Sequence, residues 1–214
     1  MYSLYVVTDT AVSGKSHIEV AELAYTGGAD VVQLRDKEMC AADMLVVAKK
    51  MAEMAKSHKK LFIVNDRVDV ALVSGADGVH IGQSDLPCKA VREIVPDDFI
   101  IGVSARTVTE AVTAERDGAD YVVLSPIFPT ETKKDAGEGA GLEVLVKMKR
   151  ALGIPVLAIG GINVDNAPKI IENGADGIAV VSAVLAKGLC VPDAVKEMKI
   201  LVEDAKVRAS EARQ

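Results

Sequence analysis

Aromatic residues are scarce in this sequence, and tryptophan is absent. Only 3% of the 214 residues are aromatic, whereas 50% are hydrophobic. A core must therefore be built from Val, Ile, Leu and Ala, and branched aliphatic residues are typical of buried parallel strands. The length fits one α/β barrel, because that fold often occupies about 200 to 250 residues as a single unit.

Basic charge, cysteine and long apolar runs are also scarce. The formal net charge is -6 and no long run of Lys or Arg occurs, so the pattern of proteins that bind nucleic acid or an anionic membrane is missing. No apolar run reaches the ~18 to 20 residues of a transmembrane helix, and no secretory signal is recognisable. Cys40, Cys88 and Cys190 fit no metal or redox spacing, which favours a reducing compartment. We expect a cytoplasmic enzyme that acts on small molecules, and the oligomeric state stays open.

A short motif recurs four times before strand-like runs. The copies are "GGADVVQL", "SGADGVHIG", "DGADYVVLS" and "NGADGIAVVS", which start at residues 27, 74, 117 and 173. In each copy, a glycine that can end a helix precedes Ala, Asp and an apolar run of strand length. Four further apolar runs lie at 4–8, 61–65, 99–104 and 154–161. Helical spacing fills the segments between runs, as Met44, Val47, Met51 and Ala55 illustrate.

Eight strand-like runs that alternate with helical segments predict an α/β fold, a (β/α)8 TIM barrel. We expect residues 1–214 to form this barrel as a single domain, since no linker or shift in composition divides them. An open, doubly wound sheet is the alternative. In such a barrel the functional site lies at the carboxyl ends of the strands. The residues that follow each run are therefore the candidates for binding and catalysis.

The second run ends in a cluster of polar residues. Gln33, Arg35 and Lys37 are spaced by two, so they point to the same side of an extended segment. A glutamine and two cations on one side suit a phosphate or a diphosphate. A solvated strand end that pairs with Asp36 and Glu38 is the alternative, although buried strands seldom have so many charges.

Two carboxylates, Asp66 and Asp85, follow the third and fourth runs. Neighbouring strands of a barrel bring such residues close together, and the residues beside them, such as Asn65 and Gln83, also offer oxygen. Mg2+ is commonly held by one or two carboxylates while substrate phosphates complete its shell. The alternative is that Asp85 caps a helix with Pro87 in its first turn.

The last two predicted strands end in residues that suit a phosphate. A Gly-Gly pair at 160–161 follows the seventh run, and Ser182 follows the eighth. Many barrels bind phosphate at this place through backbone N–H groups and the start of a helix. Ordinary tight turns are the alternative.

Histidine and nucleophilic residues give no clear catalytic group. His80 lies inside the fourth run, where it is either a hydrogen-bonded core residue or a catalytic one. His17 and His58 lie in polar helical contexts, and we expect both to be solvated. No serine or cysteine has a recognisable nucleophile context, so covalent catalysis is not indicated.

Taken together, these residues resemble the thiamine-phosphate synthase family, also called the thiamine-phosphate pyrophosphorylase family. The matching segments are "QLRDK" (33–37), "NDRVDVA" (65–71), "GVHIGQSDLP" (78–87), "GVSART" (102–107), "SPIFPTETKKDAG" (125–137), "AIGGI" (158–162) and "VVSAV" (180–184). They span nearly the whole chain, in order, at the ends of six or seven predicted strands. One departure is Arg106, which stands where the family's "GVSxHT" usually has histidine.

The resemblance implies a transfer that joins hydroxymethylpyrimidine diphosphate to a thiazole phosphate, with release of diphosphate. The implied contacts to the pyrimidine diphosphate are Gln33, Leu34, Arg35, Asp36, Lys37, Asn65, Ser104 and Lys133. The implied contacts to the thiazole phosphate are Thr130, Glu131, Thr132, Gly161, Val181 and Ser182. The implied Mg2+ ligands are Asp66 and Asp85, and the implied catalytic groups are Arg35, Lys37, Ser104 and Lys133.

The implied reaction is dissociative, because diphosphate leaves before the thiazole nitrogen attacks, and it needs no general base.

Three other functions stay open. A thiazole tautomerase-like isomerase on the same barrel would not need the cations of residues 33–37 or the two aspartates. A non-catalytic phosphate-binding barrel would keep only the phosphate pocket. A phosphosugar isomerase would need an acid and base pair, for which the sequence offers no candidate.

Overall fold

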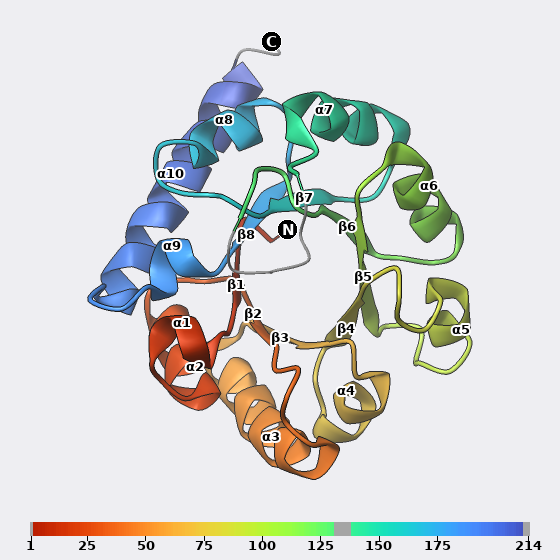
Figure 1. Cartoon of the computed structure of the whole chain (residues 1–214), viewed down its shortest axis with the longest axis vertical. Coiled ribbons are helices and arrows are strands. Elements are labelled where there is room, and N and C mark those ends of the chain that lie inside the picture. Colours follow the sequence, from red (N-terminus) through yellow and green to blue (C-terminus); the bar gives the residue numbers. More distant parts are fainter. Residues whose placement is uncertain (1, 131–137, 212–214) are drawn as a thin grey trace.

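Eight parallel strands close into a barrel in the computed structural model of the chain (Figure 1). The structure describes residues 2–130 and 138–211. The strands are Leu4–Val7 (β1), Val31–Leu34 (β2), Leu61–Asn65 (β3), Gly78–Ile81 (β4), Ile100–Ala105 (β5), Tyr121–Leu124 (β6), Val156–Ile159 (β7) and Gly177–Val180 (β8). Each strand pairs with the next, and β1 also pairs with β8. The closed barrel confirms the predicted fold class, and the open sheet was the wrong alternative.

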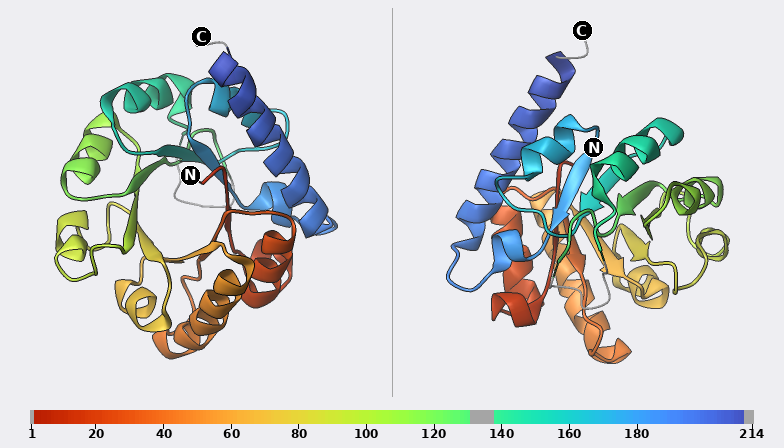
Figure 2. Two further views of the ribbon diagram at one scale, coloured as in Figure 1. Left: turned by 180° about the vertical axis from the view of Figure 1, so that it is seen from behind. Right: turned by 45° about the horizontal axis from the view of Figure 1, so that its top comes forward.

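Helices form an outer ring around the strands, seen along the barrel in Figure 1 and from two other directions in Figure 2. They are Thr10–Ser13 (α1), His17–Thr26 (α2), Ala41–His58 (α3), Val68–Ser74 (α4), Cys88–Arg92 (α5), Val108–Arg116 (α6), Gly141–Ala151 (α7), Ala167–Glu172 (α8), Ser182–Leu185 (α9) and Val191–Glu211 (α10). The helical spacing is confirmed in α3, where Met44, Met51 and Ala55 are buried. Among the described helices, none combines the length and the apolar character needed to cross a membrane.

The repeated Gly-Ala-Asp motif ties the strands together at their amino ends. In each copy, the aspartate carboxylate accepts a hydrogen bond from a backbone N–H near the start of the preceding strand. The pairs are Asp30 with Leu4 at 3.1 Å, Asp77 with Phe62 at 2.8 Å, Asp120 with Ile101 at 2.7 Å and Asp176 with Val156 at 2.8 Å. Hydrogen bonds to a charged acceptor contribute about 1.5 to 3 kcal/mol each. The motif therefore stabilises the amino face of the barrel.

Alternation along the strands separates two cores. Outward side chains pack against the helices, whereas inward side chains form a smaller cluster inside the barrel. The inward cluster consists of Tyr5, Val7, Val31, Ile63, Tyr121, Val123, Leu157 and Ala179. Along β2, Leu34 joins the helix-facing core, while Gln33 borders the cavity within the barrel. Inward polar residues thus gather toward the carboxyl ends of the strands.

Candidate active site

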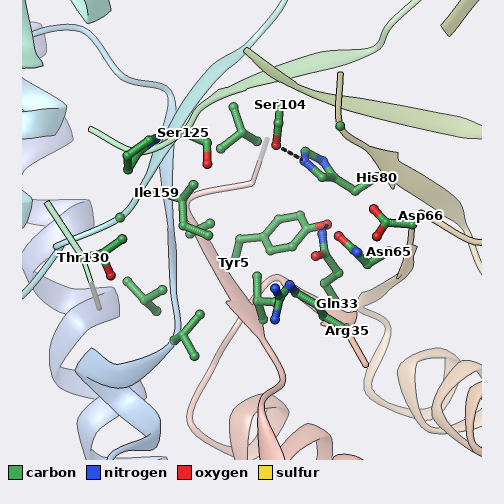
Figure 3. Close-up of a pocket in the computed structure, with 18 of the residues that line it drawn as sticks. Tyr5, Gln33, Arg35, Asn65, Asp66, His80, Ser104, Ser125, Thr130 and Ile159 are labelled. Carbon is green, nitrogen blue, oxygen red and sulfur yellow. Dashed lines mark hydrogen bonds between the residues drawn. The ribbon is translucent and has the colours of Figure 1, made fainter. Parts of the chain in front are cut away.

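A cavity of about 400 Å³ opens at the carboxyl ends of the strands, and all eight strands or the loops after them contribute to its lining. Ligand pockets commonly measure roughly 300 to 1,000 Å³. Figure 3 shows its two sides, with Arg35, Asn65 and Asp66 on one side and Ser125 and Thr130 on the other. The cavity lies where the sequence analysis placed the functional site.

The cations that follow β2 line this cavity. Arg35 and Lys37 border it together with Gln33. The Arg35 backbone N–H donates to Thr8 Oγ1 at 3.3 Å, and its guanidinium Nη1 lies 3.9 Å from Asp9 Oδ2. That separation is longer than the contacts of a bidentate pair. Arg35 therefore keeps donors that can bind an anion in the cavity.

His17 is buried, so the expectation that it is solvated was wrong. Its ring joins two segments, because Nδ1 lies 2.7 Å from Thr8 Oγ1 and Nε2 lies 3.0 Å from Asp36 Oδ2. Asp36 Oδ1 also accepts from the N–H groups of Glu38 and Met39. Burial opposes ionisation of Asp36, but the hydrogen bonds from His17 and these two N–H groups hold its pKa below the ordinary value. The loop after β2 is thus attached to the start of α2.

Two of the expected substrate-binding residues direct their side chains elsewhere. Leu34 is fully buried in the helix-facing core. Asp36 is occupied by His17 and by the turn that follows. Both residues shape the segment that holds Arg35 and Lys37, and neither side chain lines the cavity.

Asp66 and Asp85 meet beside the ends of β3 and β4, as expected for neighbouring strands. Burial raises the pKa of Asp66 to about 6, and the charge of Asp85 and a hydrogen bond with Asp85 add to this rise. The cations Lys37 and Arg35 lower the pKa and so offset part of it. Asp85 Oδ2 also accepts from the Gly82 N–H at 2.7 Å. Asp66 has a left-handed backbone with φ of 61°, which Asp and Asn tolerate better than most residues.

The arrangement of these two carboxylates fits a divalent cation. Burial and, after it, the charge of Asp85 raise the pKa of Asp66, and a bound dication would relieve both effects. Among the described residues no third His, Cys, Asp or Glu completes a cluster with them, so substrate oxygens or water would supply the remaining ligands. Helix α5 begins after Pro87 without a side-chain cap. The alternative role of Asp85 as a helix cap was therefore wrong.

The opposite side of the cavity is built from the loop after β6 and the ends of β7 and β8. A Cβ atom on Gly160 would lie 2.6 Å from Pro126 Cβ, and one on Gly161 would lie 2.6 Å from the Pro129 carbonyl oxygen. Both glycines also have positive φ. The Gly-Gly pair is therefore required for close packing of this loop, which brings Thr130 to the cavity.

Several groups on this side suit an anion. Thr130, Gly161, Val181 and Ser182 line the cavity, and α9 begins at Ser182. The first N–H groups of a helix have no partners within the helix and attract anions. The remaining candidates from this loop lie outside the described residues, and their roles stay predictions: Glu131, Thr132 and Lys133.

A series of hydrogen-bonded side chains crosses the interior of the barrel below the cavity. Gln33 Nε2 donates to the Tyr5 hydroxyl at 2.9 Å, and the hydroxyls of Tyr5 and Tyr121 lie 3.0 Å apart. The Tyr121 hydroxyl lies 3.2 Å from His80 Nδ1. His80 Nε2 lies 2.9 Å from Ser104 Oγ, and Figure 3 marks this hydrogen bond. His80 is thus a buried, hydrogen-bonded residue, one of the two interpretations that its sequence position allowed.

Comparisons with known proteins show the family to which the chain belongs. The family model described as thiamine monophosphate synthase matches residues 4–184. The chain belongs to the thiamine monophosphate synthase family. A thiamine-phosphate synthase of Methanocella arvoryzae is 54% identical over 187 residues, which are 87% of this chain and 88% of that protein. A thiamine-phosphate synthase of Chloroflexus aurantiacus is 45% identical over 97% of this chain and 96% of its own length. The solved thiamine phosphate pyrophosphorylase of Pyrococcus furiosus has a TM-score of 0.88 at 41% identity, and the match covers 95% of this chain and 96% of that one.

Two residues of this thiamine monophosphate synthase family member were missed by sequence reasoning. Tyr5 and Tyr121 are almost fully buried inside the barrel, beside the cavity. A signal existed for Tyr121, because the position after Asp in the repeat holds Val31, Gly78 and Gly177 in the other copies. A large polar side chain there, in a chain with few aromatics, indicates a special role.

The family departure at Arg106 also lies at the cavity. Arg106 lines it, and the Arg106 backbone N–H donates to Glu110 Oε2 at 2.6 Å. Thr107 begins α6 with a capping box that uses the same carboxylate. The segment after β5 is thus positioned by a regular helix start.

Proposed function

We propose that this chain joins hydroxymethylpyrimidine diphosphate to a thiazole phosphate, forming thiamine phosphate and releasing diphosphate. The observation that supports this most is one cavity that is lined on two opposite sides by groups suited to phosphate oxygens or to a metal ion that binds them. Arg35 and Lys37 with the Asp66–Asp85 pair form one region, and Thr130 with the starts of the loops after β7 and β8 forms the other. Two phosphorylated substrates can therefore lie side by side.

The pyrimidine diphosphate would lie on the side of β2 to β5. When the bond between the methylene carbon and the diphosphate oxygen breaks, negative charge develops on that oxygen. Arg35, Lys37 and Ser104 border the cavity there, and donors that are already oriented toward such charge lower the barrier most effectively. Asn65 would contact the same diphosphate, and Lys133 is proposed as a further cation from its sequence position.

We propose that Asp66 and Asp85 hold a metal ion and that this ion is Mg2+. When bound, the ion would stabilise charge on the departing diphosphate. The chain's own contribution is to hold the two carboxylates together in spite of their repulsion, with Lys37 and Arg35 nearby. Oxygen-only ligands and an incomplete protein shell are typical of Mg2+ sites that also bind phosphates.

The thiazole phosphate would bind at Gly161, Val181, Ser182 and Thr130, which places its ring against the apolar part of the cavity. Loss of diphosphate leaves a cationic methylene on the electron-rich pyrimidine, and the thiazole nitrogen then forms the new C–N bond. No proton has to be removed, so no general base is required. The protein aligns the two reactants and keeps water away from the cation.

A tautomerase-like isomerase is the main alternative. It would bind the thiazole phosphate without a diphosphate substrate, so Arg35, Lys37 and the paired aspartates would have no ligand. Burial of two repelling carboxylates is costly, and their presence favours the synthase. We also propose that the enzyme works as a single-domain protein in the cytoplasm.

One experiment tests the function directly. The purified chain is incubated with both substrates, with Mg2+ or with EDTA, and thiamine phosphate and diphosphate are quantified by chromatography. We expect equal amounts of both products, formed only with the metal. Absence of thiamine phosphate under all conditions would contradict the proposal. Exchange of the thiazole tautomers without any diphosphate substrate would favour the isomerase instead.

A further inference from the structure

With the Gln33 amide nitrogen facing the Tyr5 hydroxyl, the side chains that cross the barrel interior have one self-consistent direction of hydrogen-bond donation. The amide nitrogen of Gln33 can only donate, so the Tyr5 oxygen accepts from it. The single proton of Tyr5 then has Tyr121 as its acceptor. Burial raises the pKa of both phenols above the ordinary value, so both remain protonated donors.

Continuing the chain fixes the state of His80. The Tyr121 oxygen accepts from Tyr5, so its own proton points to His80 Nδ1. A neutral imidazole that accepts at Nδ1 has its proton on Nε2, and His80 Nε2 then donates to Ser104 Oγ. If Tyr121 donated to Tyr5 instead, the Tyr5 oxygen would accept from both Gln33 and Tyr121, and its own proton would have no acceptor among these two contacts. A buried donor without an acceptor costs about 1 to 3 kcal/mol.

We propose that Tyr5, Tyr121 and His80 are positioning residues that keep the hydroxyl proton of Ser104 directed into the cavity. This proposal rests on the proposed function, in which Ser104 donates to the departing diphosphate. A serine that accepts from His80 has its own proton available for an anionic oxygen. A serine that instead donated to His80 would present a lone pair to the developing negative charge.

The glycine inside β5 supports this assignment. A Cβ atom on Gly102 would lie 2.1 Å from Tyr121 Cζ, 2.3 Å from its hydroxyl oxygen and 2.6 Å from His80 Nδ1. Glycine in the middle of a strand weakens the strand and often marks the close approach of another group. Here it leaves the space in which the phenol and the imidazole meet. The rings of His80 and Tyr121 lie 5.7 Å apart.

The direction of the chain can be tested without any substrate. The protein has three histidines, so the ring nitrogens of His80 can be assigned by 15N-resolved NMR with His17 and His58 as internal references. We expect His80 in the parent protein to be a neutral ring with its proton on Nε2. A ring protonated on Nδ1, or a mixture of both forms, would overturn the proposal even if the chain is an active synthase.

The consequence for catalysis is tested with Tyr121→Phe. This change removes the donor to His80 Nδ1, so the imidazole can adopt the tautomer with its proton on Nδ1 and no longer donate to Ser104. We therefore expect kcat to fall about 10- to 100-fold. Tyr25→Phe is the matched control, because the Tyr25 hydroxyl is also mostly buried and donates to the Leu61 carbonyl at 2.8 Å outside the barrel interior. We expect the control to retain the parental kcat.

A double-mutant cycle separates positioning from a general loss of stability. If Tyr121 acts through Ser104, Tyr121→Phe should lower kcat much less in a Ser104→Ala background than in the parent. An equal fall in both backgrounds would overturn the proposal. If the parent chain forms no thiamine phosphate at all, the proposed function fails, and the NMR result alone decides the direction of the chain.

Discussion

Replacing Asp66 with asparagine should stabilise the metal-free protein while it removes activity. Burial, the charge of Asp85 and the hydrogen bond to it raise the pKa of Asp66 from 3.8 to about 6. At pH 8 the folded protein therefore holds a charge that it disfavours. The asparagine side chain would be neutral and could donate to Asp85, and asparagine tolerates the left-handed backbone at this position.

The magnitude follows from the pKa change. A rise from 3.8 to about 6 corresponds to about 3 kcal/mol for a fully buried group, at about 1.4 kcal/mol per pKa unit. Asp66 is partly exposed, so solvent screening reduces this to about 1 to 1.5 kcal/mol. For a chain of this size we expect the melting temperature to rise by about 2 to 6 °C.

The sign of the pH dependence is fixed by the same shift. Because the pKa of Asp66 is higher in the folded protein, the folded state binds more protons than the unfolded state between about pH 4 and pH 6. The free energy of unfolding therefore decreases as the pH rises through this range up to about 6. The gain from Asp66→Asn should therefore be present in full at pH 8 and fall to about a third of that value at pH 4.5. Thermal unfolding in EDTA at both pH values measures it.

Asp69→Asn is the control for this experiment. The Asp69 carboxylate pairs with Arg67, and the hydrogen bond from Arg67 lowers its pKa, so its removal should give no gain at pH 8. Mg2+ should raise the melting temperature of the parent protein and leave Asp66→Asn unchanged. An equal gain at both pH values, or no gain at pH 8, would refute the reasoning about the two carboxylates.

Three further substitutions test the other parts of the site. Lys133→Ala should abolish formation of thiamine phosphate with an unchanged circular dichroism spectrum, whereas Lys134→Ala should not; parental activity of Lys133→Ala would remove it from the site. His17→Ala removes the contacts to Thr8 and Asp36 that hold the loop after β2. It should therefore raise KM for the pyrimidine diphosphate about tenfold without changing KM for the thiazole phosphate, and His58→Ala serves as the control in steady-state kinetics. Gly161→Ala should raise KM for the thiazole phosphate, because its Cβ would lie 2.6 Å from a backbone oxygen, and unchanged kinetics would show that this loop can shift freely.

The sequence was informative where the signal is local. The Gly-Ala-Asp motif marks every second strand, and alternation predicted that Gln33, Arg35 and Lys37 point to the same side. Both patterns depend on residues that are close together in the chain. The burial of His17 was missed because its partner Asp36 lies 19 positions away. Tyr5 and Tyr121 were missed for the same reason, since their hydroxyls meet across 116 positions.

The two ends of the barrel use aspartate in opposite ways. Parallel strands present unpaired N–H groups at their amino ends, where Asp30 accepts two of them and pairs with Lys60. Burial opposes ionisation of Asp30, but hydrogen bonds from Lys199 and the Leu4 N–H lower its pKa below the ordinary value. At the carboxyl ends the strands present carbonyl oxygens, which cannot donate to a carboxylate. Burial raises the pKa of Asp66, and the charge of Asp85 adds to this rise. The cation that we propose at this pair would supply the stabilisation that the strands do not give.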